Sequence, residues 1–180
     1  MSLTDEQLLA RARVGDDRDA FGELVRRHQS SVRLFLRHLT RGNAELADDL
    51  AQDTFLAAYR GLARFRGEGS LNTWLLGIAH NLWRNERRRQ RTVQLEPAHL
   101  GELEPVRPST AASDLHADLA AALGRLEPEE RTALHLSYQQ GLSHSQIAGV
   151  LGWPLGTVKT HLTRSKEKLR THLASWNPQT

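Results

Sequence analysis

A chain of 180 residues is long enough for one medium domain or two small ones. Hydrophobic residues make up 39% and charged residues 25%, which is the balance of a globular protein. The lack of cysteine excludes disulfides and cysteine-ligated zinc, and a net charge of +3 does not by itself indicate a nucleic-acid partner. The position of the charge along the chain therefore matters more than its sum.

No stretch has the pattern of a leader or a membrane span. The first six residues, MSLTDE, lack the basic and apolar regions of a signal peptide. The longest nearly apolar run, residues 74–79, is far shorter than the roughly 20 residues that a span requires. We therefore expect a soluble, cytoplasmic protein with no direct membrane insertion.

The N-terminal half predicts four helices. Thr4 and Gln7 have capping-box spacing, which predicts a short first helix, and Asp17 is suited to cap a second. In the second helix, apolar residues recur at intervals of three and four over residues 21–39, which predicts a broad buried stripe.

Two further helices follow in this half. Gly42-Asn43 interrupts the apolar pattern, and a third helix is expected from about residue 44 to 62. Ser70 or Asn72 then begins a fourth, which runs into a cluster of arginines.

Residues 92–112 differ from the rest of the chain. They contain Pro97, Pro105 and Pro108 and show no sustained periodicity, which is typical of a linker. Beyond them, Ser113 and the Glu127-Pro128 pair predict two more helix starts. Strand-like alternation is absent from the sequence. We therefore predict an all-α protein with two small helical domains, residues 1–92 and 113–180, joined by a flexible linker over residues 93–112.

The most informative stretch is LSHSQIAGVLGWPLGTVKTHLTRSKEKLR, residues 142–170. Ser143 and Gln146 form a second capping-box pattern, Gly152-Trp-Pro154 predicts a stop and turn, and a further helix opens at Gly156. Two short helices joined by a glycine-containing turn are the anatomy of a helix-turn-helix.

The charge of this stretch favours DNA as its partner. Residues 155–170 carry five basic side chains and one acid, whereas residues 113–130 are mainly acidic. Four side chains point away from the apolar face of the second helix and can reach a major groove: Lys159, Thr160, Thr163 and Arg164. The alternative is a solvated helix, since a basic last turn also suits the helix dipole.

Two stretches resemble one family. Residues 142–170 resemble the promoter-reading C-terminal domain of bacterial sigma factors. DDLAQDTFLAAYRGLARFRGEGSLNTWLLGIAHNLWRNERRR, residues 48–89, resembles their N-terminal polymerase-binding domain. Their order and the size of the chain resemble the extracytoplasmic-function (group IV) sigma factors. The resemblance implies a sigma factor that directs core RNA polymerase to promoters and assists promoter opening.

The resemblance also implies roles for single residues. DLAQDTF matches the helix that the family places against the clamp of the polymerase β′ subunit, while FRGEGSLNTW matches the loop that captures an unstacked base of the minus-ten element. A contact of the C-terminal domain with the β flap and a regulating anti-sigma factor are also implied. The residues implied for polymerase binding are Asp49, Gln52 and Asp53. Those implied for the minus-ten element are Phe65, Asn72 and Asn81, with Phe65 also expected in the core. The minus-thirty-five element is assigned to Lys159, Thr160, Thr163 and Arg164, and DNA phosphates are assigned to Arg84, Arg87, Arg88, Arg89 and Arg91.

His80, Trp83 and Trp153 depart from the residue types expected at their positions, so the promoter sequence cannot be transferred from a relative. The nine histidines are scattered without metal-ligand spacing. No nucleophile elbow, phosphate loop or carboxylate pair indicates catalysis. We therefore expect no metal, no cofactor and no enzymatic activity. Two alternatives remain: a stand-alone DNA-binding regulator, and a helical protein that lies on anionic membrane through its arginines.

Overall fold

The structure, a computed structural model, describes residues 3–14, 17–65, 67, 69–93 and 114–173. Within these residues every regular element is helical, which confirms the all-α prediction. The chain divides into two compact units, Met1–Leu100 and Gly101–Thr180, and each is described by itself. Of the predicted linker, only Val93 lies within the described residues, as the last residue of a helix.

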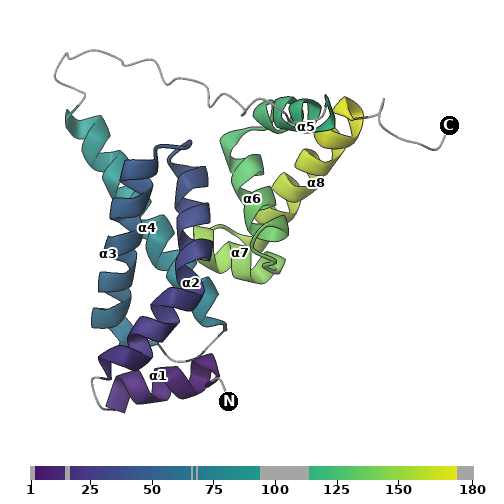
Figure 1. Ribbon diagram of the computed structural model, residues 1–180. Coiled ribbons are helices and arrows are strands. Elements are labelled where there is room, and N and C mark those ends of the chain that lie inside the picture. Colours follow the sequence, from purple (N-terminus) through teal and green to yellow (C-terminus); the bar gives the residue numbers. More distant parts are fainter. Residues whose placement is uncertain (1–2, 15–16, 66, 68, 94–113, 174–180) are drawn as a thin grey trace. The chain divides into compact units, whose positions relative to one another are not determined.

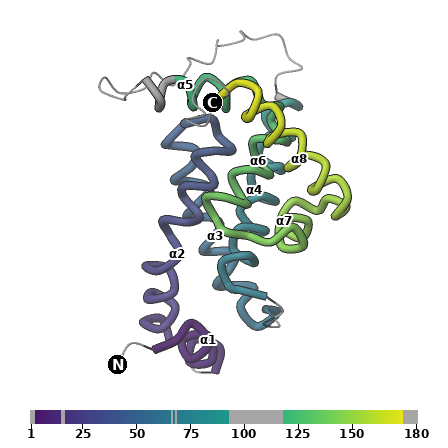
Figure 2. The backbone as a smooth tube through the Cα atoms, turned by 90° about the vertical axis from the view of Figure 1, so that its right-hand side faces the viewer, coloured from purple at the N-terminus to yellow at the C-terminus, as the bar shows by residue number. Residues whose placement is uncertain are grey.

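The N-terminal unit is a bundle of three long helices with a short helix across one end (Figures 1 and 2). The long helices are α2 (Arg18–Leu39), α3 (Ala44–Gly61) and α4 (Leu71–Val93), and the short one is α1 (Asp5–Val14). A single 3-10 turn, η1 (Leu62–Arg64), follows α3. The α3–η1 end therefore lies beside α1, which contacts both α2 and η1.

Local capping explains where these helices begin. The Asp17 carboxylate accepts a hydrogen bond from the Ala20 N–H at 3.0 Å, and Asn43 does the same for Leu46 at 3.0 Å. The Ala20 N–H and the Arg11 guanidinium hold the pKa of Asp17 below its ordinary value. At the start of α4, the Thr73 N–H donates to Ser70 Oγ at 3.2 Å. Ser70 rather than Asn72 is thus the cap.

The core of the N-terminal unit is the apolar stripe of α2. Val32, Phe35 and Leu36 have no exposed surface and pack between α3 and α4. Burying one such side chain contributes about 1.5–3 kcal/mol. The fully buried Thr54 of α3 is tolerated because its hydroxyl donates to the Leu50 carbonyl at 2.7 Å.

The C-terminal unit packs three helices against a long last one. They are α5 (Asp114–Gly124), α6 (Pro128–Tyr138) and α7 (His144–Leu151), and all three contact α8 (Leu155–His172). The core consists of small and aliphatic residues, including Ala133, Leu136, Ile147, Leu151, Val158 and Leu162. A basic α8 can therefore hold one face in the core and leave the other to solvent.

In the part of the chain that the structure describes, no helix is both long enough and apolar enough to cross a membrane. The same residues contain no group of three potential metal ligands.

Candidate nucleic-acid and polymerase interfaces

Helices α7 and α8 form the predicted helix-turn-helix. The capping box at its start is present: Ser143 Oγ accepts from the Gln146 N–H at 3.3 Å, and Gln146 Oε1 accepts from the Ser143 N–H at 2.8 Å. Gly152 ends α7 in the left-handed conformation with φ of 67°, which glycine adopts without steric cost. The chain then enters α8 directly after Pro154.

One face of α8 is buried and the opposite face is free. Val158, Leu162 and Ser165 are at most 2% exposed, whereas all four predicted reading residues are exposed: Lys159, Thr160, Thr163 and Arg164. The Thr160 hydroxyl donates to the Gly156 carbonyl at 2.9 Å, so its donor is already used within the helix. Among the described residues, neither Lys159 nor Arg164 has an acidic partner. Their charges are therefore available to a ligand.

Two other cations of α8 are held by the domain itself. Lys168 Nζ lies 2.8 Å from a carboxylate oxygen of Glu130 on α6, and that carboxylate side chain is only 3% exposed. Burial alone would raise the pKa of Glu130, but hydrogen bonds from Lys168 and the Glu127 N–H outweigh it and lower the pKa. Lys166 Nζ lies 5.7 Å from the ring centre of Tyr138.

Trp153 has a structural role that the sequence did not reveal. Its ring lies 5.2 Å from that of His161, measured between ring centres, so the turn residue packs against α8. Because both rings are half-buried, this contact helps to fix the direction in which α8 leaves the turn.

Helix α4 changes from a buried to a basic surface along its length. Leu76 and Ala79 have no exposed surface, while Asn81 and the arginines that follow it are exposed. Asn81, Arg84 and Arg88 are three and four residues apart, so they share one face of the helix. Two arginines have partners: the Arg87 guanidinium lies 5.0 Å from the ring centre of Trp83, and Arg89 pairs with Glu86 at 3.1 Å.

The connection between η1 and α4 holds the other predicted minus-ten residues. Phe65 is 7% exposed and its ring centre lies 5.0 Å from that of Trp74, so it is a core residue at the base of the connection. Gly67 and Gly69 have φ of 76° and 95°, a region that favours glycine. Asn72 is half-buried, and its Oδ1 accepts a hydrogen bond from Ser31 at 2.7 Å. Asn81 is the most accessible of the three.

The predicted polymerase-binding residues form an exposed edge on α3. Asp49, Gln52 and Asp53 all face solvent. Neither Asp49 nor Asp53 has a basic partner among the described residues, whereas the neighbouring Asp48 pairs with Arg33 of α2 at 3.3 Å. This edge therefore offers two uncompensated carboxylates and an amide.

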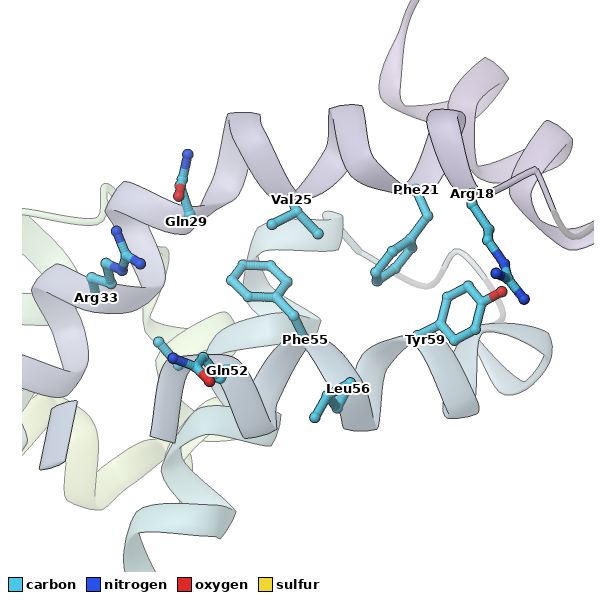
Figure 3. Close-up of a pocket in the computed structure, with 10 residues that line it drawn as sticks. Arg18, Phe21, Val25, Gln29, Arg33, Gln52, Phe55, Leu56 and Tyr59 are labelled. Carbon is cyan, nitrogen blue, oxygen red and sulfur yellow. The ribbon is translucent and has the colours of Figure 1, made fainter. Parts of the chain in front are cut away.

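Beside this edge lies a groove that the sequence did not predict. It runs between α2 and α3, has a volume of about 520 Å³ and includes Gln52 (Figure 3). Phe55 points from α3 toward Val25 of α2 in the middle of the groove, and Leu56 is 54% exposed. The full lining is Arg18, Phe21, Val25, Gln29, Arg33, Ala51, Gln52, Phe55, Leu56 and Tyr59.

Comparison with known proteins gives consistent matches for both units. The family model of Sigma-70 region 2 matches residues 24–93, and that of Sigma-70, region 4 matches residues 116–169. The ECF RNA polymerase sigma factor SigM of Mycobacterium tuberculosis is 36% identical over 174 residues, which are 97% of this chain and 87% of that protein.

Two solved structures have a similar fold. The sigma factor RpoE of Bartonella quintana, solved with the anti-sigma factor NepR, is 27% identical with a TM-score of 0.69 over 86% of this chain and 96% of that chain. CnrH, solved with the cytosolic domain of CnrY, is 29% identical with a TM-score of 0.66 over 95% of this chain and 97% of that chain.

Two helical units that match regions 2 and 4, the second with a basic helix-turn-helix, define a transcription factor of the sigma-70 class. The order of the two regions and the near full-length similarity to SigM narrow the class further. The chain belongs to the ECF family of RNA polymerase sigma factors and functions in transcription initiation.

Proposed function

We propose that the two domains divide the work of initiation between them and that the chain makes no covalent bond itself. Residues 1–92 bind core polymerase and engage the minus-ten element, residues 113–180 read the minus-thirty-five element, and residues 93–112 link them. The observation that carries this proposal is the pair of exposed, unpaired cations on α8, Lys159 and Arg164, with the core on the opposite face. The protein acts in the cytoplasm, where its polymerase is.

In the minus-thirty-five contact, α8 enters the major groove with Lys159, Thr160, Thr163 and Arg164 toward the bases. Lysine and arginine donate to guanine edges, and the threonine methyl groups contact thymine. Thr160 suits the apolar contact because its hydroxyl proton is directed to Gly156. The buried Val158 and Leu162 keep the helix from rotating in the groove.

In the minus-ten contact, the exposed Asn81 binds the edge of an unstacked base. Asn72 and the glycines beside Phe65 shape the pocket, with Phe65 as its buried support. Extruding a base costs a few kcal/mol, which a pocket that binds the free edge offsets. Arg84, Arg87, Arg88 and Arg91 contact phosphates of the adjacent duplex and position the protein without reading sequence.

In the polymerase contact, Asp49, Gln52 and Asp53 bind the basic clamp of the β′ subunit. The α2–α3 groove adjoins Gln52 and supplies the apolar part of the same interface, since an interface combines an apolar centre with a polar rim. The C-terminal domain makes a second contact with the β flap.

The same protein is held inactive by an anti-sigma factor. The similar RpoE was solved with the anti-sigma factor NepR. With no cysteine in this chain, any cysteine-based redox or zinc sensing resides in the partner.

Two single substitutions test the division of work. Arg164→Ala is expected to weaken use of the minus-thirty-five element about tenfold, through loss of a guanine contact, and to leave polymerase binding unchanged.

Asp53→Ala is expected to weaken polymerase binding about fivefold, as one exposed charge at an interface does, and to leave DNA reading unchanged. Transcription from promoters selected from a random library measures the first effect, and titration of core polymerase measures the second.

Lys166→Ala and Glu45→Ala are the matched controls. Lys166 is a cation of the same helix that lies over Tyr138, and Glu45 is an exposed acid of the first turn of α3. Equal loss of both activities in both test variants would contradict the division. DNA binding without any complex with polymerase would instead indicate a stand-alone regulator.

A further inference from the structure

Arg13 of α1 holds the chain where it leaves η1. Its Nε donates to the Leu62 carbonyl at 3.2 Å, and its Nη2 donates to the Phe65 carbonyl. The guanidinium carbon also lies 5.6 Å from the centre of the Phe65 ring. One side chain thus makes three contacts with a segment about fifty residues away in sequence.

These contacts lie just before the part of the chain that contains Gly67 and Gly69. The Leu62 carbonyl, at the start of η1, also accepts the Phe65 N–H at 3.2 Å, whereas Phe65 follows the last residue of η1. Beyond them, no described heavy atom lies within 4 Å of the position a side chain would take at Gly67 or Gly69. Phe65 itself is held by Arg13 of α1 and by Trp74 of α4.

Helix α1 is itself firmly attached, so Arg13 is presented from a fixed element. Leu8, Leu9 and Ala12 are buried. The Asp5 carboxylate lies 2.7 Å from His28 Nε2 and 3.0 Å from Arg27 Nη1, both on α2. Burial alone would raise the pKa of Asp5, but these two partners outweigh it and lower the pKa.

We propose that Arg13 is a positioning residue for capture of the unstacked minus-ten base. It acts through Phe65, which it holds by the backbone carbonyl and the ring, and not through a contact of its own with DNA. Phe65 is the buried support of the proposed base-binding residues Asn72 and Asn81. The inference rests on the proposed role of the connection between η1 and α4 in base capture. A lysine cannot replace Arg13, because only the planar guanidinium presents two donors in a fixed fork to two carbonyls.

The test uses the full chain assembled with core polymerase. The probe is the single-stranded minus-ten sequence that the wild-type holoenzyme enriches from a randomised library, with a second strand that carries an abasic site at the captured position. The ratio of the two affinities measures base capture. Arg13→Met is expected to lower this ratio about tenfold, and Arg13→Lys severalfold, because a hydrogen bond from a charged donor is lost. Mere destabilisation would weaken binding of both strands alike.

Arg11→Met is the matched control. Arg11 lies two residues away on the same helix, is 57% exposed and pairs with Asp17 instead, so its removal is expected to leave the ratio unchanged. Asn81→Ala is the positive control and is expected to lower the ratio. Thermal unfolding of each variant shows whether it is folded.

The outcomes distinguish a failure of base capture from a failure of the positioning role of Arg13. If the wild-type holoenzyme discriminates against an abasic site at no position, base capture fails, and the role of Arg13 fails with it. If wild type discriminates and Asn81→Ala does not, while Arg13→Met keeps the wild-type ratio, only the role of Arg13 is overturned. Should Arg13→Met fail to fold, a wild-type ratio in Arg13→Lys overturns it equally.

Discussion

Lys168→Met is expected to destabilise the C-terminal domain by about 2 kcal/mol, because it leaves the buried Glu130 carboxylate without its cation. In this variant, Glu130 Oε2 would keep the hydrogen bond from the Glu127 N–H at 3.1 Å. The cost is smaller than for a fully buried pair because the Lys168 side chain is 40% exposed. Hydrogen exchange of the α6 and α8 amides in the full chain measures this loss.

The double variant Glu130→Gln with Lys168→Met separates the buried charge from general packing. Glutamine retains an oxygen for the Glu127 N–H and needs no cation, so the double variant is expected to recover most of the lost stability. Lys166→Met is the control, since Lys166 only lies over the exposed Tyr138. Equal destabilisation by Lys166→Met and Lys168→Met, or no recovery in the double variant, would show that the buried pair is not the cause.

The Glu130–Lys168 pair shows what the sequence could not predict. The capping box at Ser143 was predictable because its two members are three residues apart and the helix geometry is fixed. Lys168 lies 38 residues from Glu130 in the sequence. The sequence pattern alone therefore groups Lys168 with the other cations of the predicted DNA-binding helix. Because its partner Glu130 is buried, Lys168 instead stabilises the packing of α8 against α6. Contacts between distant helices depend on packing that periodicity does not encode.

The proposed minus-ten site likewise combines features that the sequence predicts with features that only the structure shows. The resemblance placed Phe65, Asn72 and Asn81 together, and the all-α prediction placed Asn81 on a helix. Only the structure shows that Asn81 is exposed while Phe65 is 7% exposed. The α2–α3 groove was not predictable because the apolar stripe of a helix does not reveal how much of it a neighbour covers.

The two helices that we propose to face DNA are built in the same way. In α4 and in α8, small or aliphatic residues fill the core on one face, and most polar residues of the other face are exposed. A side chain on a packed helix is held in a narrow range of positions, which a loop would not achieve. Phe65 lies outside these helices, and Arg13 holds it in place through hydrogen bonds to the Leu62 and Phe65 carbonyls.

A fall in pH from about 6.5 to 4 is expected to cost the C-terminal domain up to about 3 kcal/mol through His135. Burial on α6 lowers the pKa of this histidine from 6.5 to about 4. Between these values the unfolded chain binds a proton that the folded chain does not, so stability rises with pH. The contribution is complete above the unfolded pKa and is lost as the pH falls toward the folded one.

His135→Leu replaces the titrating imidazole with an apolar side chain of similar size, so it is expected to flatten the dependence of stability on pH in this range. Urea unfolding of the full chain at several pH values, followed through amide signals of α6 and α8, measures the slope. His144→Leu is the control, because His144 is an exposed histidine at the start of α7 and its removal is expected to keep the slope. A slope that persists between pH 6.5 and 4 in His135→Leu would contradict the assignment to His135, because the carboxylates lose their contribution mainly below their own unfolded pKa values.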